Sequence, residues 1–127
     1  MNNDWKDRIV RMSGAAVQKC MRCGKCSATC PNYGEMEYHP HQFVYMVERG
    51  DTERLMASPS IFECLTCFAC VERCPRGVEP AKVIEAVRLE VIRQKGANHL
   101  KPDDLPAAAD EDLPGQALVT ALRKFAK

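Results

Sequence analysis

The sequence predicts an all-α domain over residues 1–96, followed by a tail over residues 97–127. Apolar residues recur at helical spacing, and no segment alternates apolar and polar residues for long enough to form a strand. Proline and glycine stand where helices begin and end, as Pro40 and Gly50 do. Only eight residues are aromatic (one Trp, three Tyr and four Phe), so something besides aromatic packing is expected to fill part of the interior.

The first predicted helix lies within residues 1–19. Trp5, Ile9 and Met12 share one helical face, which we expect to pack in the core. A Ser-Gly pair interrupts this pattern shortly before the first cysteine.

A second helix is predicted from Pro40 to Gly50, because proline suits a first helical position and glycine a C-terminal cap. Its apolar face consists of Phe43, Val44 and Val47. Two short helices are expected to follow. Asp51 is the expected cap of the one that contains Leu55 and Met56, and Ser58 is the expected cap of the next, with Pro59 in its first turn.

The strongest helical pattern begins at Pro80 and is expected to stop at Lys95 and Gly96. Its apolar face consists of Val83, Ile84, Val87, Val91 and Ile92. Arg93 and Lys95 lie at the end where the helix dipole favours cations.

The tail begins with residues 97–114, which contain three prolines and five acids and predict an extended segment. A short amphipathic helix follows, with Leu118, Leu122 and Phe125 on one face. This face either docks on a partner subunit or makes a satellite contact with the chain's own domain.

All eight cysteines lie in two runs of identical spacing. Residues 20–31 read CMRCGKCSATCP and residues 64–75 read CLTCFACVERCP, so each run is C-x2-C-x2-C-x3-C-P. In ferredoxins with two [4Fe–4S] clusters, the first three cysteines of such a run bind one cluster and the fourth binds the other. We therefore predict two [4Fe–4S] clusters with crossed ligands. The first cluster is assigned Cys20, Cys23, Cys26 and Cys74, and the second Cys64, Cys67, Cys70 and Cys30.

Zinc and disulfides are the alternatives for these cysteines. Structural zinc sites usually pair two C-x2-C motifs, without a third cysteine and a trailing C-P. Residues 1–14 do not resemble a signal peptide, and no apolar run approaches the roughly 20 residues that span a bilayer. We therefore expect a cytoplasmic protein whose cysteines serve metal or redox chemistry and not disulfides.

The formal net charge of +1 shows no basic excess of the kind that binds nucleic acid. Two cubanes of about −2 each would bring the loaded protein to about −3. Four basic residues flank the runs, and they either ease cluster reduction, face a partner, or are ordinary solvated charges. These are Arg22, Lys25, Arg73 and Arg76. His39 and His41 are interpreted as helix-start residues, because eight cysteines already complete two cubanes.

With both runs placed, the sequence resembles the C subunit of heterodisulfide reductase and its bacterial relatives. The resemblance covers residues 8–95 and rests on VQKCMRCGKCSATCP, on CLTCFACVERCPRGVEP and on the helical spacer of 33 residues between Cys30 and Cys64. Such a spacer is characteristic of the α-helical ferredoxin module, which is also found in succinate dehydrogenase iron–sulfur subunits and glycolate-oxidase-like proteins.

The resemblance implies an electron-transfer subunit of a hetero-oligomeric complex. In that family, an A-type subunit with flavin and clusters delivers electrons to the C-type subunit. The C-type subunit passes them to a B-type subunit, whose CCG motifs hold the catalytic cluster. This sequence contains no CCG motif and no unassigned cysteine, so we expect no substrate site and no catalytic residue in it. A diffusible ferredoxin-type carrier and a zinc-binding structural adaptor are the competing hypotheses.

Overall fold

The computed structural model describes residues 3–93, 103 and 110–123. All regular secondary structure within these ranges is helical, which confirms the predicted all-α fold. The chain divides into two compact units, Met1–Gln94 and Lys95–Lys127.

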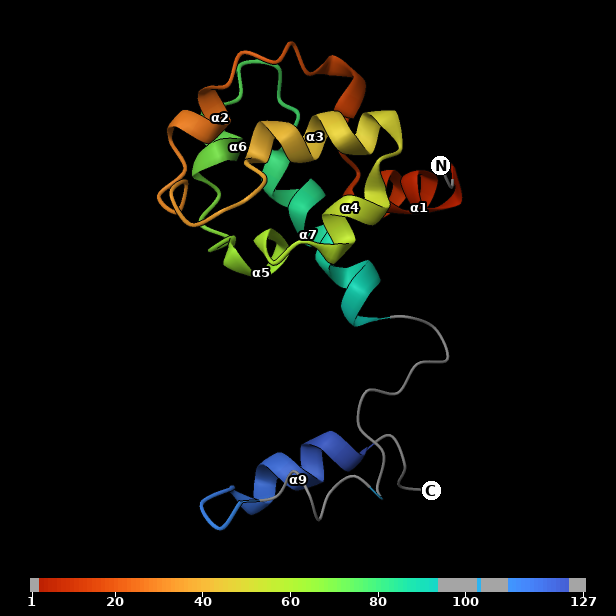
Figure 1. Ribbon diagram of the computed structural model, residues 1–127, viewed down its shortest axis with the longest axis vertical. Coiled ribbons are helices and arrows are strands. Elements are labelled where there is room, and N and C mark those ends of the chain that lie inside the picture. Colours follow the sequence, from red (N-terminus) through yellow and green to blue (C-terminus); the bar gives the residue numbers. More distant parts are fainter. Residues whose placement is uncertain (1–2, 94–102, 104–109, 124–127) are drawn as a thin grey trace. The chain divides into compact units, whose positions relative to one another are not determined.

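Helix α7 is the central element of the first unit. It contacts α1, α3, α4, α5 and α6, while two short helices that carry cysteines, α2 and α6, pack on each other (Figure 1). In chain order the elements are α1 (Asn3–Ser13), η1 (Val17–Lys19), α2 (Lys25–Ala28), α3 (Pro40–Arg49), α4 (Thr52–Ala57), α5 (Ser60–Glu63), α6 (Ala69–Arg73) and α7 (Pro80–Ile92).

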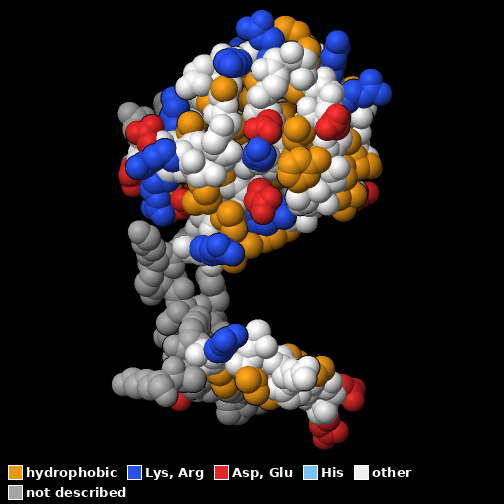
Figure 2. Space-filling view, turned by 180° about the vertical axis from the view of Figure 1, so that it is seen from behind, with side chains coloured by type: hydrophobic (Ala, Val, Ile, Leu, Met, Phe, Trp, Pro, Cys, Tyr) orange, Lys and Arg blue, Asp and Glu red, His pale blue; other side chains and the backbone are white. Residues whose placement is uncertain are grey.

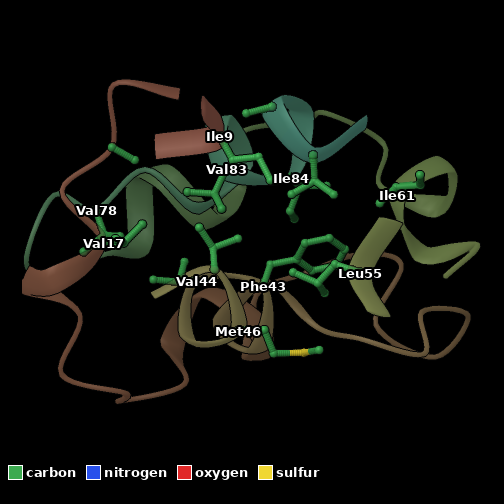
Figure 3. Close-up of a cluster of buried hydrophobic side chains, with 14 of the residues drawn as sticks. Ile9, Val17, Phe43, Val44, Met46, Leu55, Ile61, Val78, Val83 and Ile84 are labelled. Carbon is green, nitrogen blue, oxygen red and sulfur yellow. The ribbon is translucent and has the colours of Figure 1, made fainter. Parts of the chain in front are cut away.

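The hydrophobic core fills the space between α3 and α7. Phe43 of α3 and Val83 and Ile84 of α7 are fully buried there, together with Leu55 of α4 (Figure 3). These residues come from the apolar faces that the sequence predicts for the helices at 40–49 and 80–92. Ile9 brings α1 into the same core.

The ends of α3 follow the predicted proline and glycine signals. Pro40 occupies the first turn, and His39 is the N-cap, whose backbone N–H donates to Gln42 Oε1 at 2.8 Å. Gly50 ends the helix with a φ of 87°, a left-handed conformation that glycine adopts without a side-chain clash.

Three details of the predicted helices are wrong. Met12 and Ile92, near the C-terminal ends of α1 and α7, are exposed and not in the core. Asp51 is the N-cap of α4, as predicted, although it makes no side-chain capping hydrogen bond. Ser58 is not the N-cap of α5, which begins at Ser60 after Pro59, although Ser58 Oγ does accept from the Ser60 N–H at 3.3 Å. The predicted stop at Lys95 and Gly96 lies outside the described residues.

A buried ion pair attaches α1 to α7. Arg8 Nη2 lies 2.9 Å from Glu90 Oε2, and the Glu90 side chain is only 2% exposed. Trp5 is half-buried beneath the Arg8 guanidinium, whose Cζ lies 4.9 Å from the ring centroid, so Trp5 braces this ion pair and is not a central core residue.

The second unit contains α9 (Gly115–Leu122). Leu118 and Leu122 are half-buried within it, and Val119 is exposed. Phe125, which the sequence places on the same face, lies outside the described residues. None of the described helices is both long and apolar enough to cross a membrane.

Candidate iron–sulfur centres

The two cysteine runs follow the same backbone path. Arg22 and Thr66, which precede the second cysteine of each run, have φ angles of 58° and 55°. Gly24 and Phe68, which follow that cysteine, have φ angles of 76° and 62°. Two left-handed residues in each loop curl the backbone around its cysteines before the short helices α2 and α6 begin.

The first cavity is lined by cysteines from both runs. Its cysteines are Cys20, Cys23, Cys26 and Cys74. This set is the one predicted for the first cluster.

The second cavity is lined by the complementary cysteines. They are Cys30, Cys64, Cys67 and Cys70. The remaining lining is apolar apart from Asn32, and it includes Met36, Leu65 and Phe68.

The electrostatics of the thiols reflect the same grouping. Burial raises the pKa of Cys26, and the charges of Cys20 and Cys74 raise it further. Burial likewise raises the pKa of Cys30, with Cys64 and Cys67 contributing. The thiols of each cavity are therefore close enough for their charges to oppose one another, an opposition that bound iron would relieve.

The two cavities lie next to each other in the interior. Cys26 and Cys70 are both buried and pack in one cluster with Ala81. Burial raises the pKa of Cys70 to about 11, and Cys26 of the other cavity is among the charges that contribute. Cys23 and Cys67, by contrast, are exposed at the surface.

The donor set fits two cubanes better than single metal ions. Each cavity offers four thiols, the number of corners that a [4Fe–4S] cluster presents. Within the described part of the chain, no three His, Cys, Asp or Glu side chains are grouped closely enough to hold one metal ion.

Arg88 is a structural residue that the sequence analysis missed. It extends from α7 to the second loop, where Nη2 donates to the Cys64 carbonyl at 3.0 Å and Nη1 to Thr66 Oγ1 at 3.4 Å. Its Nε also donates to the carbonyl of Ile61. No local pattern marks this arginine, because its partners lie 22 to 27 residues away along the chain.

The two histidines are helix-start residues, as predicted, but their surroundings differ. His39 is the N-cap of α3 and stacks on Tyr33, with 3.8 Å between the ring centroids. His41 lines the first cavity, and its Nδ1 shares a hydrogen bond with Ser27 Oγ. Burial lowers the pKa of His41, so its ring is neutral near pH 7.

The four basic residues flanking the runs separate into two pairs. Arg22 and Arg76 line the first cavity. Lys25 and Arg73 line an open depression between α2 and α6.

On the side of the molecule opposite to that in Figure 1, basic and acidic side chains are interspersed with apolar ones (Figure 2).

Fold and cavities together define an all-α iron–sulfur module with two cluster sites. Residues 16–78 match the family described as 4Fe-4S dicluster domain, and the chain holds two [4Fe–4S] clusters.

Three proteins of similar sequence show which members of this class the chain resembles. The chain is 32% identical over 93 residues to the C2 subunit of the H(2)/formate:CoB-CoM heterodisulfide,ferredoxin reductase of Methanococcus maripaludis, and the match covers 73% of this chain and 49% of the relative. It is 27% identical over 93 residues to the C subunit of the H(2):CoB-CoM heterodisulfide,ferredoxin reductase of Methanothermobacter thermautotrophicus, covering 73% of this chain and 50% of the relative. It is 32% identical over 89 residues to the C subunit of the Ferredoxin:CoB-CoM heterodisulfide reductase of Methanosarcina acetivorans, covering 70% of this chain and 36% of the relative.

Residues 16–78 belong to the 4Fe-4S dicluster domain family, and the chain is similar in sequence to heterodisulfide reductase C subunits. It spans about half the length of the first two of these relatives and about a third of the third.

Proposed function

We propose that this chain is an electron-transfer subunit of a cytoplasmic, heterodisulfide-reductase-like complex. Its partners are an A-type protein that bears flavin and clusters and a B-type protein with CCG motifs. When bound, each [4Fe–4S] cubane accepts and releases one electron. The chain contributes no catalytic residue and acts by holding, burying and connecting the two sites.

The observation that carries this proposal is the placement of the cysteines between surface and interior. Each cavity has one exposed cysteine, Cys23 or Cys67, at which a redox partner can approach. Each also has one buried cysteine, Cys26 or Cys70, and these two pack together. Two surface-accessible sites that meet inside one small domain suit a relay between two partners, whereas a carrier that visits one partner at a time needs only one such site.

Crossed ligation is part of the proposal. Cys74 completes the site of Cys20, Cys23 and Cys26, and Cys30 completes the site of Cys64, Cys67 and Cys70. The lining of the two cavities and the mutual charge effects of their thiols support this assignment.

Four serine variants test the ligand assignment under anaerobic conditions. Cys74→Ser and Cys23→Ser are expected to lose the same electron paramagnetic resonance signal, while Cys30→Ser and Cys67→Ser lose the other. Each variant should retain about half of the roughly eight iron atoms that two cubanes contain. If Cys74→Ser instead lost the same signal as Cys67→Ser, the crossed assignment would be wrong.

Co-purification tests the role in a complex. A tagged chain isolated from its own host without oxygen is expected to bring with it a flavoprotein and a CCG-motif protein. Elution as a lone monomer that exchanges electrons with several enzymes would favour the diffusible carrier. A colourless protein with two zinc ions and no inorganic sulfide would exclude both.

A further inference from the structure

The two cluster sites are related by an internal repeat that holds residue by residue from the first cysteine of each run to the residue after its C-P pair. The loops share their left-handed positions, as described above, and the helices that follow them also correspond. Pro80 at the start of α7 lines the first cavity, and Pro40 at the start of α3 lines the second. Differences between the two cavities can therefore be compared as substitutions at matching positions of one scaffold.

The matching positions differ in charge. Arg22 of the first run corresponds to Thr66 of the second, because each stands two residues after the first cysteine. Arg76 corresponds to Asn32, because each follows the C-P pair. Both arginines line the first cavity, whereas no Lys, Arg, Asp or Glu is among the described residues that line the second.

Both guanidinium groups are held in place. Arg22 lies over the ring of Tyr45 from α3, with its Cζ 4.2 Å from the ring centroid. Arg76 Nε donates to the Lys19 carbonyl at 3.2 Å, which joins the residue before the first run to the residue after the second. His41 also lines this cavity, and the two guanidinium groups supply its charged side chains.

We propose that Arg22 and Arg76 make the two clusters inequivalent, so that the cluster of the first cavity has the higher reduction potential and receives the first electron. This inference deepens the proposed function and rests on its ligand assignment. Reduction adds one electron and no proton, so the site gains one negative charge. A nearby fixed cation stabilises that charge. The lining of the second cavity, which includes Leu65 and Phe68, contains no charged residue. Arg88 lies behind the second loop, where its N–H groups donate to the carbonyls of Ile61 and Cys64, and it does not line the cavity.

The test exchanges residues between matching positions and measures the potentials. The double variant R22T/R76N gives the first cavity the residues found in the second. Dithionite, a one-electron donor once dissociated, is used in an anaerobic titration followed by electron paramagnetic resonance. We expect two midpoint potentials in the parent chain. In the variant, the higher midpoint potential should fall by about 59 mV, which for a one-electron couple is about a tenfold decrease in the ratio of reduced to oxidised cluster at a given applied potential. The lower midpoint potential should not change.

A second variant works in the opposite direction. Asn32→Arg introduces a cation beside the second cavity and retains N–H groups that can donate to the Glu63 carbonyl, to which Asn32 Nδ2 donates at 2.6 Å. It is expected to raise the lower potential and leave the higher one unchanged. Arg11→Gln on α1 removes a cation that lines neither cavity and controls for net charge, with neither potential expected to move.

The outcomes separate this inference from the proposed function. Equal potentials in the parent chain, or a shift of the lower potential in R22T/R76N, would overturn the inference while leaving the two clusters in place. Potentials that stay unchanged in both exchange variants would overturn it as well. Absence of inorganic sulfide in the parent chain would instead overturn the proposed function.

Discussion

Phe68 provides a quantitative test of the loop geometry. It occupies a left-handed position with a φ of 62°, where its counterpart in the first run is Gly24 with a φ of 76°. A left-handed conformation costs an L-residue roughly 1–2 kcal/mol relative to glycine. The side chain recovers part of this cost, because Phe68 is 38% exposed and lines the second cavity.

The cost of the left-handed backbone and the gain from side-chain burial at Phe68 can be separated with two variants. Full burial of a Phe side chain stabilises by about 1.5–3 kcal/mol, so the buried part of Phe68 contributes about 1–2 kcal/mol. Phe68→Ala loses this burial and keeps the strained backbone. Phe68→Gly loses the same burial but removes the strain, so we expect Phe68→Gly to be more stable than Phe68→Ala by about 1 kcal/mol. This order is the reverse of that in a helix interior, where glycine is about 1 kcal/mol worse than alanine.

Gly24→Ala is the matched control. Apart from its chain neighbours, no protein atom lies within 4 Å of the Cβ that this substitution would add, so within the protein its cost comes from the backbone. We expect a loss of about 1 kcal/mol.

Urea unfolding of the cluster-loaded variants under anaerobic conditions, followed by circular dichroism, measures the order. With a denaturant slope of about 1–3 kcal/mol/M, a difference of about 1 kcal/mol moves the midpoint by about 0.3–1 M. If Phe68→Ala were as stable as Phe68→Gly or more so, the left-handed assignment of this position would be refuted.

Three further variants test the supports around the sites. Arg88→Met leaves the carbonyls of Ile61 and Cys64 without their donor, which should lower the stability by about 1–3 kcal/mol. Because only the second site is affected, half of the iron should transfer to a chelator faster than the other half. Equal rates for both halves would contradict this. Arg8→Gln leaves the Glu90 carboxylate buried without its ion-pair partner and should destabilise by about 2–4 kcal/mol in urea unfolding, more than Glu90→Gln does, because a neutral amide tolerates burial better. Phe43→Ala should cost about 3–5 kcal/mol in the same assay without changing either reduction potential.

The elements that the sequence predicts correctly are those whose determinants are local. Pro40 and Gly50 act within one turn of the helix they delimit, so the bounds of α3 follow from the residues themselves. The spacing of the cysteines likewise reflects the geometry of a cubane, which is the same in any chain. The pairing of each run with the last cysteine of the other stays a prediction, which the lining of both cavities supports.

The errors concern tertiary contacts between distant segments. The spacing of apolar residues predicts which of them share one side of a helix. How much of that side is buried depends on the helices packed against it, and Met12 and Ile92 remain exposed. Arg88 has no local signature for its hydrogen bonds to the second loop. Glu90 sits on the otherwise apolar interior side of α7, where only Arg8 of a different helix explains it.

The internal repeat explains why a domain with so few aromatic residues can hold together. Each cavity is lined by three cysteines of one run and the last cysteine of the other, so under the proposed ligand assignment neither run completes a cluster alone. A cluster bound in either cavity therefore ties residues near position 20 to residues near position 74, or residues near 30 to those near 64, in the manner of a crosslink between distant segments. Since such binding favours only the folded arrangement, its free energy adds to that of the core around Phe43. The same crossing brings the buried cysteines of the two sites together, so the feature that stabilises the fold also places the two redox sites next to each other.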